Sequence, residues 1–321
     1  MGAERDVTTV NPPAAVDPRP PFRVGWFMVA RSADLAPGSL LERTFVGEQV
    51  VAFRTESGQA AVVAAHCPHL GANLARGGAV VGEALRCPFH SLRWGPDGTC
   101  VGSEYPGDPD YAVRLPAYPT IERFGFLFAW HHPAGGEPTF DIPDLDLAGW
   151  TAITVTTIPI AAHVETVHEN GVDAVHFGVV HGFPLSGTRY EERGPSFHSE
   201  FHFATPNFLR EGPPEITTFF DTDAHGLGYA HSLNTAEAVG LRYRVLLLTT
   251  PTTAGSLDFT VATTVQRPAE GDRVAGVPVD EVADFMHRGA VGGVRQDVPI
   301  WEGLRYVDQP RLVKGDGPIP R

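Results

Sequence analysis

Short apolar runs, often β-branched and separated by turn residues, fill the chain between residues 26 and 130. Two of these runs, at residues 50–53 and 60–64, flank a Ser-Gly pair, and a third lies at residues 124–130. Runs of this length, spaced by turn residues, are typical of strands in a small all-β domain. The pattern therefore predicts an N-terminal all-β domain over residues 23–140.

The pattern changes after a proline-rich, acidic stretch at residues 133–146, which we interpret as a connection between domains. Helical periodicity at residues 164–180 and 279–304 is now mixed with strand-like runs. These runs occupy residues 153–160, 216–220, 243–249 and 257–265. Residues 141–321 are therefore predicted to form an α+β domain, in which antiparallel strands are backed by a long C-terminal helix.

Length and composition fit two globular domains and narrow the choice of partners. The chain has 321 residues, 42% hydrophobic and 19% charged, so each domain can bury its own core. We find no run of the roughly 18 apolar residues that a membrane span needs. Residues 1–22 hold five prolines and lack the pattern of a signal peptide, so we expect a flexible tail there. The formal net charge of −14 argues against a nucleic-acid partner.

The cysteines indicate the redox compartment. There are 3 of them, Cys67, Cys87 and Cys100, which is too few and too odd a number for a disulfide framework. We therefore expect a reducing, cytoplasmic location. In such a compartment clustered cysteines are more often metal ligands or small buried side chains than halves of a disulfide.

Two of these cysteines lie in motifs that each combine Cys with His. Cys67-x-His69 is followed, after 17 residues, by Cys87-x-x-His90. Two thiolates and two imidazoles are the ligands of a Rieske [2Fe–2S] cluster, which has two Cys on one iron and two His on the other. The alternative is a Cys₂His₂ zinc site, but zinc sites usually pair Cys with Cys and His with His. Cys100 lies outside both motifs and is interpreted as a free thiol.

A second set of candidate ligands lies downstream. On a regular helix His176 and His181 would point about 140° apart, so both can bind one ion only if the helix loosens or ends between them. Gly178 permits such a break. Two histidines and a carboxylate form the facial triad of non-haem Fe(II) oxygenases. The best candidate carboxylate is Asp297, late in the C-terminal helix, whereas Asp173 is expected to hydrogen-bond an imidazole N–H of His176.

Together these motifs resemble the Rieske non-haem iron oxygenases. The two Cys/His motifs come first, and an N-x-x-D-x-x-H-x₄-H segment follows at residues 170–181. Residues 87–100 and 296–301 further resemble the branch that contains 3-ketosteroid 9α-hydroxylase oxygenases and cholesterol 7-desaturases. The resemblance implies a Rieske domain followed by a helix-grip-like catalytic domain, with a bulky, apolar substrate.

The resemblance also implies roles for individual residues. The catalytic site would include Asn170 and Asp173, and Asp173 would bridge His176 to His90 of the partner subunit in a ring-shaped homotrimer. The cluster ligands would be Cys67, His69, Cys87 and His90, and the ligands of the mononuclear iron would be His176, His181 and Asp297.

The activity implied is that of the terminal oxygenase of a multicomponent monooxygenase. Such a chain would use O₂ to hydroxylate or otherwise oxidise a steroid-, terpenoid- or polycyclic-like substrate. Electrons from NAD(P)H would arrive through a separate flavin reductase, a ferredoxin or both, since the chain shows no nucleotide-binding glycine motif. Possible cavity residues are apolar side chains of the second domain that could equally be plain core: Phe177, Phe183, Phe219, Phe220, Tyr243 and Leu247.

Two other functions stay open. One is desaturation, demethylation or oxidative cyclisation of a similar substrate, because the same metal site can support different outcomes. The other is a Rieske electron carrier with a hydrophobic-ligand domain and no oxygen chemistry. The chain also departs from the family at Ser91-Leu92, where a Gly-Trp or Asp-Trp pair is common, and it reaches Arg321 where steroid-type relatives continue. These departures imply altered donor docking and an altered substrate entrance or subunit contact.

Overall fold

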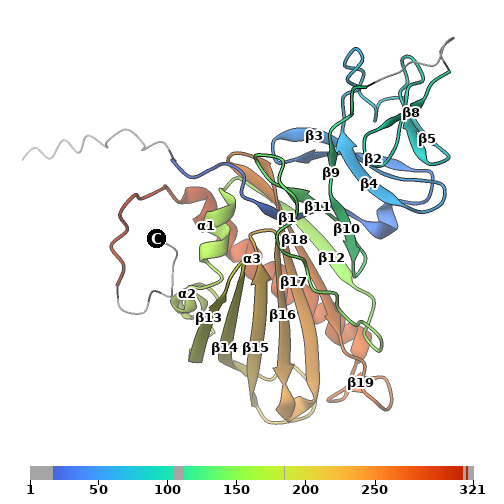
Figure 1. Ribbon diagram of the computed structural model, residues 1–321. Coiled ribbons are helices and arrows are strands. Elements are labelled where there is room, and N and C mark those ends of the chain that lie inside the picture. The colour runs from blue at the N-terminus through green and yellow to red at the C-terminus, as the bar shows by residue number, and fades with distance from the viewer. Residues whose placement is uncertain (1–16, 105–111, 184, 314–315, 317–321) are drawn as a thin grey trace, which may run out of the picture.

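The computed structural model describes residues 17–104, 112–183, 185–313 and 316. Most of the predicted flexible tail, residues 1–16, and the end of the chain, residues 317–321, therefore lie outside the described residues. Figure 1 shows a smaller β body at the upper right, and a larger sheet with a long helix below it. This arrangement confirms the predicted order of an all-β part followed by an α+β part.

The smaller body contains three antiparallel sheets, in the orders β1-β11-β10, β2-β3-β4-β9 and β5-β6-β7-β8. Two apolar clusters fill it, and one of them surrounds the two cysteines of the Cys/His motifs together with Trp94 and Leu74. Its elements are β1 (Gly25–Arg31), the 3-10 helix Ser32–Asp34, β2 (Leu40–Phe45), β3 (Glu48–Arg54), β4 (Ala60–Ala64), β5 (Ala79–Val81), β6 (Ala84–Arg86), β7 (Arg93–Trp94), β8 (Cys100–Gly102), β9 (Ala117–Tyr118), β10 (Thr120–Arg123) and β11 (Phe126–His131).

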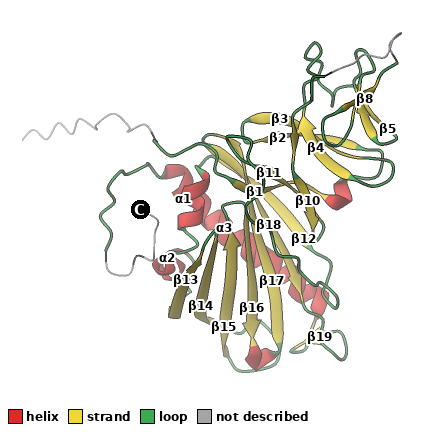
Figure 2. Cartoon of the chain, viewed as in Figure 1, coloured by secondary structure: helices red, strands yellow, loops and turns green. Residues whose placement is uncertain are grey.

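The larger body is built on one seven-stranded antiparallel sheet, in the order β12-β18-β17-β16-β15-β14-β13. The chain enters at one edge, crosses to the other through two short helices, and then returns strand by strand (Figure 2). The elements are β12 (Thr154–Ile160), α1 (Val164–Glu169), α2 (Ala174–Val180), β13 (Leu185–Arg193), β14 (Ser196–Pro206), β15 (Glu215–His225), β16 (Tyr229–Ala236), the 3-10 helix Glu237–Val239, β17 (Leu241–Thr253), β18 (Ser256–Val265), β19 (Arg273–Val274), β20 (Val277–Pro278) and α3 (Val279–Gly303).

Helix α3 packs along one face of this sheet. Its buried residues include Val291, Val294 and Trp301, and the Trp301 ring stacks on Phe259 of β18 at a centroid distance of 5.8 Å. An apolar stripe with this spacing buries one side of an amphipathic helix. Asp297 lies within the same buried stripe, which is an unusual place for a carboxylate. The long C-terminal helix predicted from the sequence is confirmed.

The helix predicted over residues 164–180 is wrong as a single element. The chain instead forms α1 and α2, separated by residues 170–173. The interruption comes at Asp173, which has extended backbone angles and whose side chain accepts hydrogen bonds from the N–H groups of Val175 and His176. Asp173 is therefore the N-cap of a new helix rather than a residue on the face of a longer one.

The two bodies are joined by direct hydrogen bonds between them. The Thr250 hydroxyl donates to the carbonyl of Met28 at 2.6 Å, and the Val46 N–H donates to the carbonyl of Pro251 at 2.8 Å. At Gly228 a Cβ atom would lie 1.9 Å from the carbonyl oxygen of Trp26, so only glycine allows these two backbone segments to approach this closely. Among the described residues, no helix is long and apolar enough to cross a membrane.

Candidate metal centres

The two Cys/His motifs form loops with the same backbone pattern. The backbone N–H of Cys67 donates to the carbonyl of Ala72 at 2.9 Å, and the backbone N–H of Cys87 donates to the carbonyl of Leu92 at 2.8 Å. In each loop the fourth residue after the cysteine donates back to the cysteine carbonyl. That residue has a positive φ in both loops, +76° at Gly71 and +54° at Ser91. The loops thus form a matched pair of turns.

These turns bring the four candidate cluster ligands to one end of the small body. Cys67 and Cys87 are buried, and the rings of His69 and His90 lie with their centroids 4.7 Å apart. Burial raises the pKa of the Cys67 thiol, and the neighbouring Cys87 adds to this effect. Buried thiolates need a nearby positive charge, which an iron–sulfur cluster would provide, so the donor set fits this group. Cys100, on β8, packs against the same apolar cluster, and its Sγ lies 3.8 Å from the carbonyl of Gly102.

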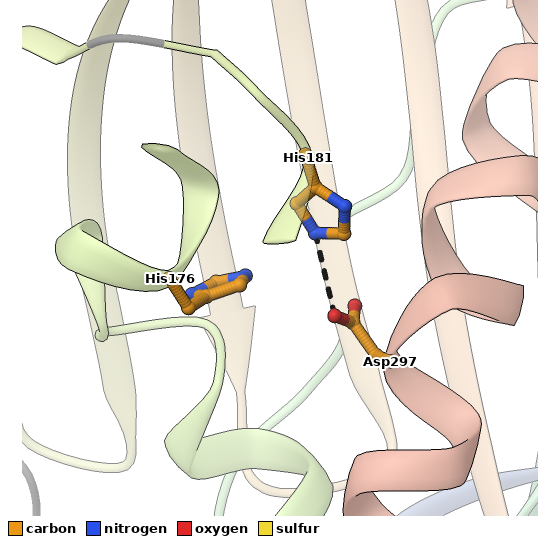
Figure 3. Close-up of side chains that lie close together, drawn as sticks. All are labelled: His176, His181 and Asp297. Carbon is orange, nitrogen blue, oxygen red and sulfur yellow. Dashed lines mark ion pairs between the residues drawn. The ribbon is translucent and has the colours of Figure 1, made fainter. Parts of the chain in front are cut away.

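The second set of candidate ligands meets between α2 and α3, as Figure 3 shows. Ligand atoms of His176, His181 and Asp297 all lie within 4.8 Å of one another. The dashed line in Figure 3 joins His181 Nε2 to Asp297 Oδ1, which are 3.4 Å apart. Both of those side chains are almost fully buried. Two imidazoles and one carboxylate converging in this way fit a facial triad.

The two histidines converge where α2 ends. Its last residue is Val180, and His181 is the C-cap, followed by Gly182 with φ +73°. The predicted ending of the helix is thus confirmed, but Gly178 is not the break, since it lies inside α2. The positive φ at Gly182 then turns the chain away from the site.

Hydrogen bonds orient both imidazoles toward the centre. His181 Nδ1 is 2.8 Å from Gln296 Oε1, and His176 Nδ1 bonds to the backbone carbonyl of Asp173. Each ring therefore turns its Nε2 toward Asp297. A partner on the far ring nitrogen is the usual way in which a ligand histidine is held. Sequence reasoning missed Gln296, although its position next to Asp297 could have suggested it.

Asn170 lies between two of these groups. Its Nδ2 is 3.0 Å from His176 Nε2 and donates to Asp297 Oδ2 at 3.3 Å. Burial raises the pKa of Asp297 to about 6, against the smaller opposing effects of His181 and Asn170. Burial lowers the pKa of His176, which favours the neutral ring that a metal ion needs. A buried carboxylate beside two imidazoles fits a cation at this position.

The hydrogen bonds of Asp173 differ from those predicted from the sequence. The predicted hydrogen bond from His176 to its carboxylate is replaced by the bond to its backbone carbonyl. The carboxylate Oδ1 instead accepts from the N–H groups of Val175 at 3.0 Å and His176 at 3.3 Å. The reason is the N-cap position, which aims a short side chain at the backbone of the next turn.

A cavity of about 1770 Å³ lies between the sheet and α3, and all three residues of the triad form part of its wall. Five of the predicted lining residues are in this wall: Phe177, Phe183, Phe220, Tyr243 and Leu247. Phe219 is not, because alternate residues of a strand face opposite sides and its ring packs 4.8 Å from His202 instead. Residues 304–310 of the C-terminal segment also border the cavity.

Sequence comparisons identify both halves of the chain. Residues 25–119 match the family model of the Rieske [2Fe-2S] domain, and residues 129–321 match that of the 3-ketosteroid 9alpha-hydroxylase C-terminal domain. The chain belongs to the 3-ketosteroid 9α-hydroxylase family of Rieske oxygenases. The resemblance noted from the motifs is thereby confirmed, as is the assignment to an oxygenase.

Relatives of this Rieske oxygenase include a desaturase and the oxygenase component of a monooxygenase. It is 30% identical to the cholesterol 7-desaturase of Bombyx mori, over 94% of this chain and 68% of that protein. It is 28% identical to the oxygenase component of a 3-ketosteroid-9-alpha-monooxygenase of Rhodococcus rhodochrous, over 93% of this chain and 81% of that protein. A crystal structure of dicamba monooxygenase has the same fold, with a TM-score of 0.71 at 18% identity over 91% and 92% of the two chains.

Proposed function

We propose that this chain is the terminal oxygenase of a multicomponent monooxygenase that hydroxylates or otherwise oxidises a bulky, apolar substrate with O₂. The observation that carries the proposal is the triad of His176, His181 and Asp297 in the wall of a large cavity. The cavity is large enough for a steroid-, terpenoid- or polycyclic-like molecule. Relatives named for cholesterol and for 3-ketosteroids support a substrate of this size.

The two ligand sets would hold two different metal centres. We assign a [2Fe–2S] cluster to Cys67, His69, Cys87 and His90, and a mononuclear Fe(II) to His176, His181 and Asp297. When bound, these centres supply single electrons and the activation of O₂.

The protein's own contribution is to orient the ligands and exclude water. Gln296 and the carbonyl of Asp173 fix the two imidazoles, and Asn170 holds Asp297 from the other side. The apolar wall keeps a substrate close to the triad and limits the access of bulk water.

Electron transfer is proposed to run between subunits. Figure 1 shows β5 and β8, which neighbour the cluster loops, at one end of the molecule and α2 at the opposite side. Exposed apolar side chains border both places: Leu70 follows the first cluster motif, Phe89 lies within the second, and they are 66% and 62% exposed, while Val179 on α2 is 81% exposed. Burying such patches against each other would favour assembly. We therefore propose a homotrimer in which Asp173 bridges the two centres, its backbone carbonyl bonded to the His176 ring and its carboxylate to His90 of the partner subunit.

The remaining components are inferred from the family. Electrons from NAD(P)H would reach the cluster through a separate flavin reductase, a ferredoxin or both, in the cytoplasm. The relative named as an oxygenase component supports a separate reductase. We further propose residues 23–140 and 141–321 as the two domains of the chain.

Desaturation is the second candidate outcome, favoured by the 30% identity to a cholesterol 7-desaturase. A Rieske electron carrier without oxygen chemistry would have no use for a buried triad beside a cavity, and we set that alternative aside.

The test is a metal analysis followed by a turnover assay. Purified protein should contain acid-labile sulfide and more iron than the sulfide accounts for. With a surrogate reductase and O₂, a library of steroids, terpenoids and polycyclic compounds should yield a product that has gained oxygen or lost two hydrogens, as measured by mass spectrometry. Zinc without sulfide would overturn the proposal.

A further inference from the structure

The segment that follows α3 borders the large cavity but is held only loosely. Residues 304–310 are part of the cavity wall. Among the described residues, none of residues 304–313 belongs to an apolar core cluster. The hydrogen bonds of residues 305–313 join only groups within the described part of the same segment. With few buried contacts, a segment of this kind detaches at little cost in free energy.

Arg19, from the opposite end of the chain, ties this segment to the body of the molecule. Its guanidinium carbon lies 5.4 Å from the centre of the Tyr306 ring. A cation is attracted to the face of an aromatic ring at this distance. Arg19 is itself held in place, since it donates to the Asp17 carboxylate at 2.7 to 3.1 Å and lies 4.0 Å from Glu169. Only 14% of its side chain is exposed.

Residues 17–24 are fixed to the region of α1, unlike the segment after α3. Arg23 forms an ion pair with Glu165, and His163 Nε2 is 3.1 Å from the carbonyl oxygen of Pro20. Figure 1 shows both the start of the described chain and the segment after α3 beside α1. Arg19 and Arg23 also belong to the cavity wall. The contact between Arg19 and Tyr306 therefore joins a fixed part of that wall to a loosely held one.

We propose that residues 304–313 form a lid over the cavity and that Arg19 controls entry by holding the lid closed through Tyr306. The lid opens when this contact breaks. The inference goes beyond the proposed function, because it concerns how any apolar molecule enters and leaves the cavity. Opening of a lid often limits the rates of ligand entry and release. Since the contact forms with or without ligand, losing it changes both rates equally and leaves the affinity unchanged.

Limited proteolysis follows the lid directly. The lid contains two trypsin sites, after Arg305 and Arg311, and cleavage in a segment reports how often it detaches. Arg19→Gln and Tyr306→Leu should each raise the cleavage rate at these sites about 3- to 10-fold, equivalent to about 0.7 to 1.4 kcal/mol, because each removes the cation–π contact. Tyr306→Phe keeps the ring and should be cleaved at the wild-type rate. Cleavage is measured by mass spectrometry of the metal-loaded protein.

A stopped-flow experiment tests whether the lid controls the cavity. The probe is Nile red, an uncharged, bulky dye whose fluorescence rises in apolar surroundings. In Arg19→Gln its association and dissociation rates should both rise about 3- to 10-fold, with an unchanged Kd. The matched control is Arg31→Gln, which removes an ion pair of 3.0 Å with Asp34 outside the cavity wall. This variant should behave as the wild type in both assays.

A double variant tests whether the two side chains act through one contact. Arg19→Gln combined with Tyr306→Leu should be cleaved no faster than either single variant, because both changes break the same interaction. The proposal is overturned if the single variants are cleaved at the wild-type rate or if their effects add. It is also overturned if the dye does not bind the wild type or if its rates are the same in Arg19→Gln. Neither assay measures metal content or product, so failure here is distinct from failure of the proposed function.

Discussion

Asp173 offers the sharpest test of the proposed route for electrons, because the structure gives its carboxylate a second role. Oδ1 caps α2 by accepting from two backbone N–H groups. Replacing an N-cap Asp by Ala costs about 1 kcal/mol, whereas Asn caps almost as well as Asp. Asp173→Asn should therefore keep the melting temperature, the iron content and the visible spectrum of the wild type. Asp173→Ala should melt lower.

A single-turnover assay distinguishes the capping role of Asp173 from its proposed role in electron transfer. The cluster is reduced beforehand, mixed with O₂ and substrate, and its reoxidation is followed by visible absorption. If Asp173 bridges His176 to His90 of the partner subunit, removing its charge weakens that bridge, since hydrogen bonds to ionised groups are about twice as strong as neutral ones. Loss of such an outer partner typically costs about 10- to 100-fold, so we expect Asp173→Asn to slow reoxidation by that factor.

The comparison of the two variants decides between the roles. If Asp173→Asn reoxidises at the wild-type rate and still forms product, the inter-subunit route through this carboxylate is wrong. A rate lowered only in Asp173→Ala would assign Asp173 to capping alone, because Asn preserves the cap and Ala does not.

Three further predictions concern separate parts of the chain. His176→Ala should lose the mononuclear iron and turnover while the visible spectrum of the cluster persists; simultaneous loss of both centres, measured by iron and sulfide analysis, would contradict two independent sites. Ser91→Gly should raise the free energy of unfolding by roughly 1 kcal/mol because it relieves a left-handed φ of +54°, and Gly71→Ala at the matching position should lower it in denaturant titrations. Burial, with a contribution from Arg244, lowers the pKa of His231 to about 4. The contribution of the neutral His231 ring to the free energy of unfolding should therefore be present above about pH 6.5 and be lost as the pH falls through about 4. His231→Asn should flatten that part of the pH profile, and an unchanged slope would refute the assignment.

Much of the fold could be read from the chain because its signals are local. Alternating and continuous apolar runs predicted strands close to β3, β4, β12, β17 and β18, and the stripe of α3 was visible in its spacing. The Cys/His motifs were equally local, since each places its two side chains on one tight turn. By contrast, the boundary between α1 and α2 was missed. Capping by Asp173 competes with the helical periodicity around it, and periodicity alone does not show which prevails.

The sequence by itself determined which chemistry was available: two thiolates with two imidazoles, a second pair of histidines, and a carboxylate within an apolar helix. Tertiary structure alone decided which of these groups meet. The convergence of Asp297 with the histidines, the hydrogen bond from His181 to Gln296 and the hydrogen bond from Asn170 to Asp297 all join segments that are far apart in the chain. The physical reason is that short-range propensities set backbone conformation within a turn or two, whereas contacts between distant segments depend on how whole faces pack and on which polar groups that packing leaves buried.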